Sequence, residues 1–319
     1  MRSCGHIAQT TLSLFFLLFS PPLFAADWPQ WRGPDRTDVS RETGLLKSWP
    51  EGGPRLVWTA RGLGGGYSTP SIARGRIFGM GYIDEKETVW ALEESTGKMV
   101  WSTPIAAANL QIGYNDGSRS TPTVDGERLY ALGVSGDLVC LSVEDGKLLW
   151  QKNLVRDFGG QVPNWGYSES PLVDGEKVIA TPGGSAATLV ALHKRTGSVL
   201  WKAQVPGGDP AAYSSCIVAE VDEQRQYIQF LSRGVVGVAA EDGKCLWRFD
   251  SPANNRGIQC STPIYHDKHV FAASAYRHGG ALAKLTTTPN GMSATEIYFT
   301  RQMQNHHGGM VLVGGFLYG

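Results

Sequence analysis

Tryptophan recurs along this chain at a nearly constant interval. Trp58, Trp101, Trp150, Trp201 and Trp247 lie 43 to 51 residues apart, and each of the last four follows a glycine by four residues. A fixed period indicates a repeat architecture, and about 40–50 residues is the size of one four-stranded blade of a β-propeller. The spacing therefore predicts an all-β fold, a β-propeller of four-stranded antiparallel blades.

Each repeat is predicted to form four short strands separated by turns. The copy that ends at Trp150 begins with Ser-Thr-Pro from Ser120, where proline suits a strand end because it cannot donate a ladder hydrogen bond. Alternation of apolar and polar residues predicts further strands at 128–131, 138–143 and 147–150. Glycine turns connect the strands, because glycine tolerates the positive φ that tight hairpins need.

The repeated tryptophans are expected to be structural. Each ends the outer strand of its blade, where a large flat ring can lie between neighbouring blades and exclude water from their interface. Stacking on a substrate is the alternative. A residue that recurs once per blade is better explained by a contact that also recurs once per blade.

The repeats predict about five blades and part of a sixth, in a propeller domain at residues 55–319. Residues 55–58 (RLVW) resemble a fourth strand with no first three before it. Residues 310–319 supply only a first strand and the start of a second. We therefore expect a fragment of a larger ring, incomplete at its C-terminal end; a closed ring of five to six blades is the alternative.

The first 25 residues have the three parts of a secretory signal. Arg2 and His6 precede an apolar run at residues 11–19, and Ala25 offers a small residue for cleavage. The run is shorter than the ~20 residues that a membrane-spanning helix needs. We expect a mature chain with an N-terminal extension at 26–54, no transmembrane helix, and a periplasmic or extracellular location; an uncleaved anchor is the alternative.

The charge balance and the cysteine content bear on nucleic-acid binding and on disulfide formation. The 29 basic residues balance 29 acidic ones, which argues against nucleic acid as a partner because phosphate binding needs a basic excess. Cys140, Cys216, Cys245 and Cys260 follow the signal, with no C-x-x-C pair among them. We expect them to be small buried residues; a Cys245–Cys260 or Cys216–Cys260 disulfide is the alternative.

A ligand site is predicted at one mouth of the propeller. First strands surround the central axis, so the residues that begin them ring one mouth, and a concave site with convergent polar groups is where a ligand is expected. No catalytic residue is assigned. The candidate ligand-binding residues are Tyr67, Arg119, Trp165, Tyr167, Glu169, Tyr213, Gln259 and His307.

Three kinds of contact are expected from this set. Arg119 can hold a carboxylate in a bidentate pair, and Glu169 can ligate calcium or act as a base. Trp165 and Tyr167 can stack on a flat ligand. The structural alternatives are a pairing of Arg119 with Glu169 across adjacent blades, and aromatic rings that plug the channel.

The dipeptide His306-His307 leaves metal binding undecided. Adjacent residues on a strand point to opposite faces, so the pair is not expected to bind one metal there. In a loop the two imidazoles can converge. The sequence assigns no metal.

The repeats resemble those of the quinoprotein (PQQ-like) β-propeller family, over about 260 residues. This family usually closes with seven or eight blades. The opening WPQWRGP at 28–34 also resembles the start of many secreted bacterial propellers with this repeat. The residues that carry the resemblance are Ala91-Leu92 with Thr96-Gly97-Lys98 and Trp101, Cys140-Leu141 with Asp145-Gly146-Lys147 and Trp150, Ala191-Leu192 with Thr196-Gly197 and Trp201, and Asp242-Gly243-Lys244 with Trp247.

The resemblance implies two alternative functions. The first is a non-catalytic scaffold similar to the BamB-like secreted propellers, which binds a protein or a small ligand at one face without a cofactor. The second is an alcohol or sugar dehydrogenase that uses pyrroloquinoline quinone (PQQ) and calcium. The chain has no Cys-Cys dipeptide of the kind that lies under the quinone in these enzymes. Glu169 can imitate part of their calcium site, but no matching aspartate base is identified.

Overall fold

The computed structural model describes Met1, residues 26–289 and residues 291–319, so the predicted signal peptide lies almost entirely outside the described residues. All regular structure in the described ranges is β-strand. The strands form five four-stranded antiparallel sheets and one two-stranded sheet. The predicted all-β propeller, with five blades and part of a sixth, is confirmed. No helix in this part of the chain is long and apolar enough to span a bilayer.

The strands of each blade follow one another in chain order. Blade 1 contains β1 (Ser71–Ala73), β2 (Arg76–Ile83), β3 (Lys86–Glu93) and β4 (Met99–Ala107). Blade 2 contains β5 (Thr123–Asp125), β6 (Arg128–Leu132), β7 (Asp137–Ser142) and β8 (Leu148–Asn153). Blade 3 contains β9 (Leu172–Asp174), β10 (Lys177–Ala180), β11 (Leu189–His193) and β12 (Val199–Ala203). Blade 4 contains β13 (Ile217–Val221), β14 (Gln224–Leu231), β15 (Gly234–Ala239) and β16 (Cys245–Phe249). Blade 5 contains β17 (Ile264–His266), β18 (His269–Ser274), β19 (Gly279–Thr288) and β20 (Gly291–Thr300), and the sixth sheet contains β21 (Val311–Val313) and β22 (Phe316–Tyr318).

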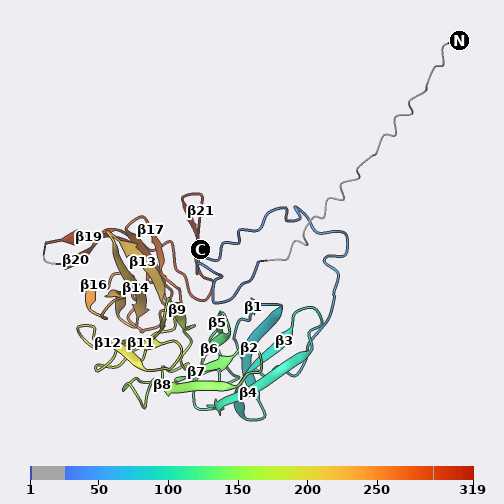
Figure 1. Cartoon of the computed structure of the whole chain (residues 1–319). Helices are drawn as coiled ribbons and strands as arrows, with labels where there is room; N and C mark the ends of the chain where they lie inside the picture. The colour runs from blue at the N-terminus through green and yellow to red at the C-terminus, as the bar shows by residue number, and fades with distance from the viewer. Residues whose placement is uncertain (2–25, 290) are drawn as a thin grey trace.

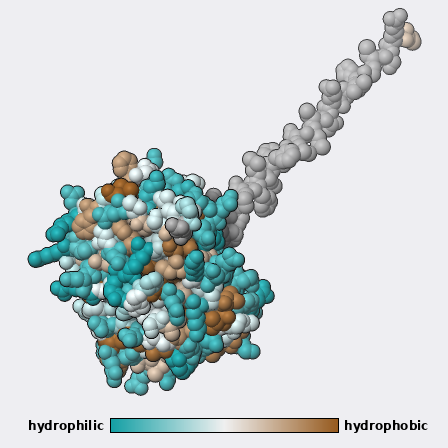
Figure 2. Space-filling view, turned by 90° about the vertical axis from the view of Figure 1, so that its left-hand side faces the viewer, coloured by the Kyte–Doolittle hydropathy of each residue, from teal (hydrophilic) through white to brown (hydrophobic). Residues whose placement is uncertain are grey.

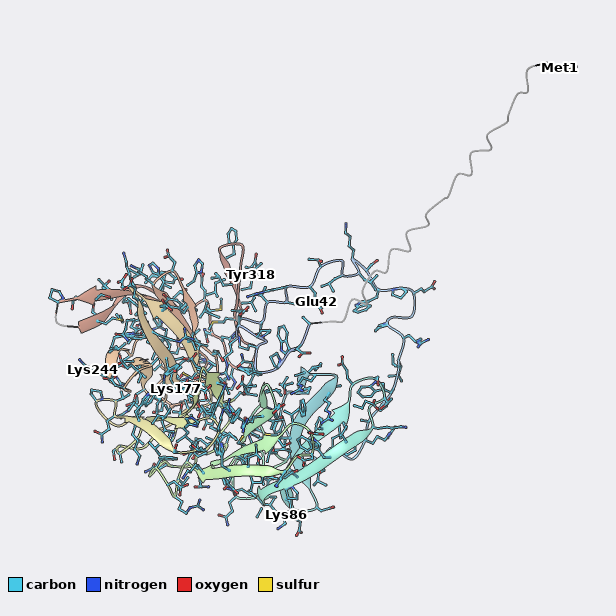
Figure 3. All side chains as sticks on the ribbon, viewed as in Figure 1. Met1, Glu42, Lys86, Lys177, Lys244 and Tyr318 are labelled. Atoms are coloured by element: carbon cyan, nitrogen blue, oxygen red, sulfur yellow. The ribbon has the colours of Figure 1, made fainter. Side chains whose placement is uncertain are left out.

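The blades are arranged in chain order around an arc (Figure 1). Lys86, Lys177 and Lys244 mark blades 1, 3 and 4 along this arc (Figure 3). The first strands lie toward the centre, where β1 contacts β5 and β5 contacts β9. The residues that precede the first strands are therefore brought together at one end of the central channel, although they come from every part of the sequence.

The hydrophobic core lies between blades. One cluster joins Trp101 of blade 1 to Leu129 and Leu141 of blade 2, and similar clusters join blades 2 and 3, 3 and 4, and 4 and 5. On the face of the molecule seen in Figure 2, hydrophobic residues form separate patches within a mostly hydrophilic surface. Each sheet is thus buried by its neighbours in the arc, as expected for stacked blades.

Four of the repeated tryptophans occupy equivalent positions between blades. The indole Nε1 of Trp101, Trp150 and Trp201 donates to a backbone carbonyl of the next blade, at 3.0, 2.9 and 3.2 Å. Trp58 does the same to Glu94 O at 2.9 Å. Trp247 differs, because its Nε1 donates to Gln226 Oε1 within its own blade.

The hairpin glycine of the next blade makes room for each of these rings. Gly197 has φ +69°, and a Cβ built there would lie 2.8 Å from the indole ring of Trp150. Any side chain at this position would therefore meet both backbone strain and a clash with the ring. The glycine and the tryptophan of the repeat motif are two sides of one contact between blades.

The fourth strand of blade 5 is present but lacks the tryptophan. In blade 2, Cys140 faces Trp150, and the register between the third and fourth strands shifts immediately after this pair. In blade 5, Leu282 faces Tyr298, and the register shifts after that pair. Tyr298 thus takes the tryptophan position. The sequence did not reveal it, because β19 and β20 are long strands that displace the turn from its usual distance.

The strand expected at residues 55–58 does not form. These residues have no strand pairing, and Leu56 and Val57 are exposed. A fourth strand needs a third strand beside it to satisfy its backbone hydrogen bonds, and no described strand occupies that place. Trp58 nevertheless contacts the blade 1 hairpin in the way that Trp101, Trp150 and Trp201 contact the hairpin of the next blade. The tryptophan contact of the repeat is therefore present here without the strand.

The N-terminal extension crosses the centre of the propeller. Trp28 pairs with Ile72 of blade 1, and Pro29 O accepts from Val124 N of blade 2. Trp31 Nε1 donates to Thr262 Oγ1 of blade 5 at 3.1 Å, and Arg32 donates to Met310 O before β21. The blue N-terminal trace enters the open side of the arc near β21 in Figure 1.

Arg36 completes this crossing. Its guanidinium is buried and donates to Ser170 O and Pro171 O of blade 3 and to Cys216 O of blade 4. Residues 28–38 therefore contact the inner strand, or the residues directly before it, in all six sheets. Residues 28–38, which begin with the motif WPQWRGP, form a plug that ties the blades together at the axis.

The four cysteines among the described residues are free thiols. Cys140 and Cys216 are buried, and Cys245 and Cys260 are partly buried. The expectation of small buried residues therefore holds for Cys140 and Cys216 and only in part for the other two, and neither of the alternative disulfides, Cys245–Cys260 or Cys216–Cys260, forms.

Candidate functional site: a cavity at the propeller mouth

A cavity of about 640 Å³ opens where the first strands begin. In each of the six sheets, the residue that begins the segment leading into the first strand lines this cavity. Residues of neighbouring loops and of the plug complete the lining. The lining residues are Trp31, Tyr67, Thr69, Tyr114, Arg119, Trp165, Ser168, Ser170, Tyr213, Ser215, Ile258, Cys260, Tyr276, His306 and His307.

The plug separates this cavity from the other end of the channel. Trp31 lines the cavity, whereas Asp35, Arg36 and Thr37 line a second hollow beside β17 and β21. In blade 4, Cys216 O accepts a hydrogen bond from Arg36, and Cys216 lies between Ser215, which lines the cavity, and Ile217, which lines the second hollow. The cavity is therefore a cup with a base formed by the N-terminal segment.

Five of the eight predicted ligand-binding residues line the cup, namely Tyr67, Arg119, Trp165, Tyr213 and His307. Trp165 and Tyr213 meet edge to face, with ring centroids 5.7 Å apart. The lining includes six Trp or Tyr residues in all. Aromatic faces of this kind favour flat or extended organic ligands.

Arg119 is held in place by the backbone beside the cup. Its guanidinium donates to Gly113 O at 2.7 Å, to Gly117 O at 2.9 Å and to Tyr114 O. It also lies 5.4 Å from the ring centroid of Tyr67. Burial lowers its pKa. Arg119 forms no ion pair with Glu169, so the pairing considered from the sequence does not occur.

The other three predicted residues lie behind the lining. Tyr167 OH donates to Pro182 O at 2.8 Å, and Gln259 Nε2 donates to Ser232 O at 3.0 Å. Glu169 accepts from Gln229 Nε2 at 3.1 Å and from Thr181 N. All three are buried, and their polar atoms are engaged within the protein. They support the loops of the cup from inside the blades.

Glu87 is a second buried carboxylate of the same kind, and sequence reasoning missed it. Its oxygens accept from Ser118 Oγ at 2.8 Å and from Val134 N at 3.0 and 3.1 Å. Burial raises the pKa of Glu87 and of Glu169, and the hydrogen bonds that each carboxylate accepts lower it. Burial is the larger effect, so both pKa values are about 7. The only sequence signal is a charged residue at an inward position of a strand.

These two groups predict a pH dependence of stability. Each pKa is higher in the folded chain than in the unfolded one, so the folded state binds more protons between about pH 4.5 and 7. Stability should therefore fall as the pH rises through this window, by up to about 1.4 kcal/mol per pH unit for each group. Urea unfolding at pH 5, 6 and 7 measures the slope.

The matched variants isolate each group. Glu87→Gln and Glu169→Gln should each flatten the slope, because glutamine does not titrate. Exposed Glu144 is the control, and Glu144→Gln should leave the slope unchanged. An unchanged slope in both buried variants would show that neither carboxyl binds a proton on folding in this range.

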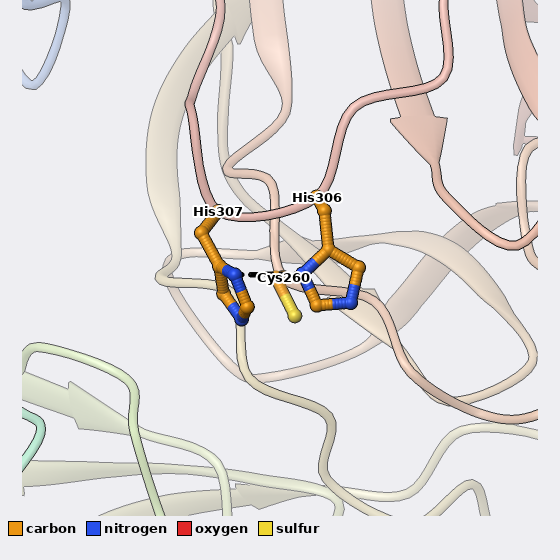
Figure 4. Close-up of side chains that lie close together, drawn as sticks. All are labelled: Cys260, His306 and His307. Carbon is orange, nitrogen blue, oxygen red and sulfur yellow. Dashed lines mark hydrogen bonds between the residues drawn. The ribbon is translucent and has the colours of Figure 1, made fainter.

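Cys260, His306 and His307 form a cluster on one wall of the cup (Figure 4). His306 and His307 lie in the loop between β20 and β21, and Cys260 precedes β17. One ligand atom of each residue lies within 4.8 Å of the others. The two Nδ1 atoms are 2.9 Å apart. Burial raises the pKa of Cys260 to about 12, and burial with the neighbouring His307 lowers the pKa of His306.

A family model described as outer membrane protein assembly factor BamB matches residues 39–161 and 85–319. The chain belongs to this family. The two matches overlap, as expected when similar repeats can be aligned in more than one register. The BamB match agrees with the PQQ-like propeller repeats identified in the sequence.

Two curated BamB proteins match parts of the chain. The protein from Shewanella oneidensis is 31% identical over 157 residues, which is 46% of this chain and 36% of the relative. That from Kangiella koreensis is 24% identical over 219 residues, which is 66% of this chain and 48% of the relative. The matches thus span less than half the length of these BamB relatives.

Two solved structures share the fold. BamB from Moraxella catarrhalis has a TM-score of 0.50 at 16% identity, covering 72% of this chain and 59% of that structure. Quinohemoprotein alcohol dehydrogenase from Comamonas testosteroni has a TM-score of 0.53 at 16% identity, covering 82% of this chain and 46% of that structure. BamB-like and quinoprotein propellers therefore both share this architecture.

The donor set of the cup does not fit the quinone–calcium alternative. Calcium takes six to eight oxygen ligands, usually with carboxylates among them. The described lining contains no Asp or Glu, and Glu169, the predicted calcium ligand, faces away with its oxygens engaged.

Proposed function

We propose that this chain is a non-catalytic, secreted or periplasmic binding scaffold that holds a protein segment or a small organic ligand in the cup. The observation that carries the proposal is the aromatic lining, closed at its base by Trp31 and bearing Arg119 at its rim. The name of the BamB relatives, outer membrane protein assembly factor, supports a partner-binding role in the cell envelope.

The chemistry of the lining suggests the kind of ligand. Trp165 and Tyr213 offer apolar faces, and Arg119 is the one Arg or Lys among the described lining residues. Its backbone bonds hold the guanidinium without a neutralising carboxylate at hydrogen-bonding distance. An extended peptide that carries aromatic and acidic side chains satisfies both features, through stacking and through a charge-assisted hydrogen bond.

Short peptides in which aromatic and acidic residues alternate should bind wild-type protein and change the fluorescence of Trp31 and Trp165. Trp165→Ala and Arg119→Gln should each weaken this binding by about tenfold or more, the usual cost of losing a central interface residue. Peptides with lysine in place of the acidic residues are the ligand control. The titrations are run with a metal chelator present.

Two results would contradict the proposal. Equal binding by wild type, Trp165→Ala and Arg119→Gln would place the peptide site elsewhere. Binding of PQQ with calcium, together with alcohol-dependent reduction of a dye, would replace the scaffold by the dehydrogenase alternative.

A further inference from the structure

We propose that Cys260, His306 and His307 bind a late first-row transition metal, with Zn²⁺ as the natural choice, in the wall of the cup. A thiolate and two imidazoles are ligands that zinc prefers, whereas calcium and magnesium prefer oxygen. The three ligand atoms already lie within 4.8 Å of one another. This inference does not depend on the proposed function, because it concerns one wall of the cup and a different ligand.

The distances suit a shared metal ion. Tetrahedral zinc, with bonds of about 2.0–2.1 Å to nitrogen and about 2.3 Å to sulfur, places its donor atoms about 3.3–3.6 Å apart. The Nδ1 atoms of His306 and His307 are 2.9 Å apart, so a small rotation of either ring reaches this spacing. Without a metal, one of these nitrogens must carry a proton to bond to the other. A cation between them uses both lone pairs.

The loops that carry the ligands are tied together by their neighbours in sequence. Ser261 Oγ, next to Cys260, donates to Asn305 Oδ1 at 2.6 Å, and Asn305 precedes His306. Asn305 Nδ2 in turn bonds to Gly309 O at 2.6 Å. Ser261 and Asn305 are both buried. The relative position of the two loops is thus set by buried hydrogen bonds, which is the support that a metal site needs.

An outer hydrogen bond orients one imidazole. His306 Nε2 lies 3.1 Å from Tyr276 OH, and the two rings meet edge to face with centroids 5.2 Å apart. Metal-bound histidines usually use their second ring nitrogen in this way, which fixes the tautomer and the ring angle. His306 can therefore present Nδ1 to a metal while Nε2 is held by Tyr276.

The site would have an open coordination position. All three ligands line the cup, so the fourth position of a tetrahedral ion faces its interior. Sites with three protein ligands and one exchangeable water differ in this respect from closed structural zinc sites. A ligand in the cup can reach the metal directly. On binding, the Cys260 thiol releases its proton to solvent and the sulfur becomes a thiolate ligand.

Cobalt titration of the purified mature chain under reducing conditions tests the site. Co²⁺ should bind one equivalent with a thiolate-to-cobalt charge-transfer band, and Zn²⁺ should displace it. Cys260→Ser should abolish the band, and Cys260→Ser and His307→Gln should each weaken binding by at least about tenfold. His307 is exposed, so His307→Gln tests the site without disturbing the fold.

The matched controls are Cys245→Ser, another partly buried free thiol, and His266→Gln, an exposed histidine outside the cluster. Both should bind cobalt as wild type does. Lack of stoichiometric binding by wild type, or a band that persists in Cys260→Ser, would overturn the proposal. The same is true if the controls lose as much affinity as the cluster variants. Peptide binding measured with a chelator present is a separate readout, so either proposal can fail alone.

Discussion

Truncation of Trp150 to alanine should lower the free energy of unfolding by about 3–5 kcal/mol, the usual cost of removing a buried aromatic side chain. The ring packs against Gly197 of the next blade and lies 6.0 Å from the ring of Tyr130, and its Nε1 donates to Lys194 O. The variant loses this packing and one of the two hydrogen bonds to Lys194 O, since Tyr130 OH still donates to the same oxygen at 3.1 Å. Urea unfolding followed by circular dichroism measures the loss.

Exposed Trp49 of the N-terminal extension supplies the control. Trp49→Ala removes the same atoms from a site with 69% exposure and should cost less than about 0.5 kcal/mol. Trp150→Phe keeps an aromatic ring but loses the Nε1 donor, and it should fall between the two. A cost below about 1 kcal/mol for Trp150→Ala would remove the blade-sealing role that we assign to this residue.

Replacement of Arg36 by methionine should destabilise the chain by about 3 kcal/mol or more. Its guanidinium donates to the carbonyl oxygens of Ser170, Pro171 and Cys216. Pro171 O also accepts from Thr123 Oγ1, so the variant leaves two buried acceptors without this donor, at a cost of about 1–3 kcal/mol each. Burial of the charged guanidinium is unfavourable and lowers the pKa of Arg36 to about 10. Methionine carries no charge, so the variant avoids this desolvation cost, which offsets part of the lost stability.

Two further variants separate charge from hydrogen bonding. Arg36→Lys keeps the charge but lacks the planar fork, so it should recover only part of the stability. Arg41 lies in the same extension, but its side chain is exposed. Arg41→Met should therefore change the free energy of unfolding by less than about 0.5 kcal/mol. If Arg36→Met costs as little as Arg41→Met, residues 28–38 do not act as a plug that ties the blades together.

The fold was largely predictable because a propeller repeats its contacts at a fixed interval. Strand pairs within a blade join neighbours in the chain, and the alternation around Trp150 was enough to place all four strands of blade 2. The exceptions have local causes. Residues 55–58 have no neighbouring strand, and Tyr298 follows a hairpin whose length breaks the spacing.

The candidate site was predicted only in part. Alignment of the repeats found the ring of residues that begins each first strand, which is why Tyr67, Arg119, Tyr213 and His307 reach the cup. Alignment does not say which way a side chain points. Tyr167, Glu169 and Gln259 come from the same segments, but they turn inward and bond within the blades.

By itself the sequence determined the blade size, the strand order and the ring of residues that begin the first-strand segments, because these depend on local periods of two and of about 43 to 51 residues. Only the tertiary structure decided the contacts that cross the axis. Trp31 meets Thr262 across 231 residues, and Arg36 meets Cys216 across 180. Such contacts belong to no repeat and leave no period in the sequence, since they depend on how the arc of blades brings distant segments to one point.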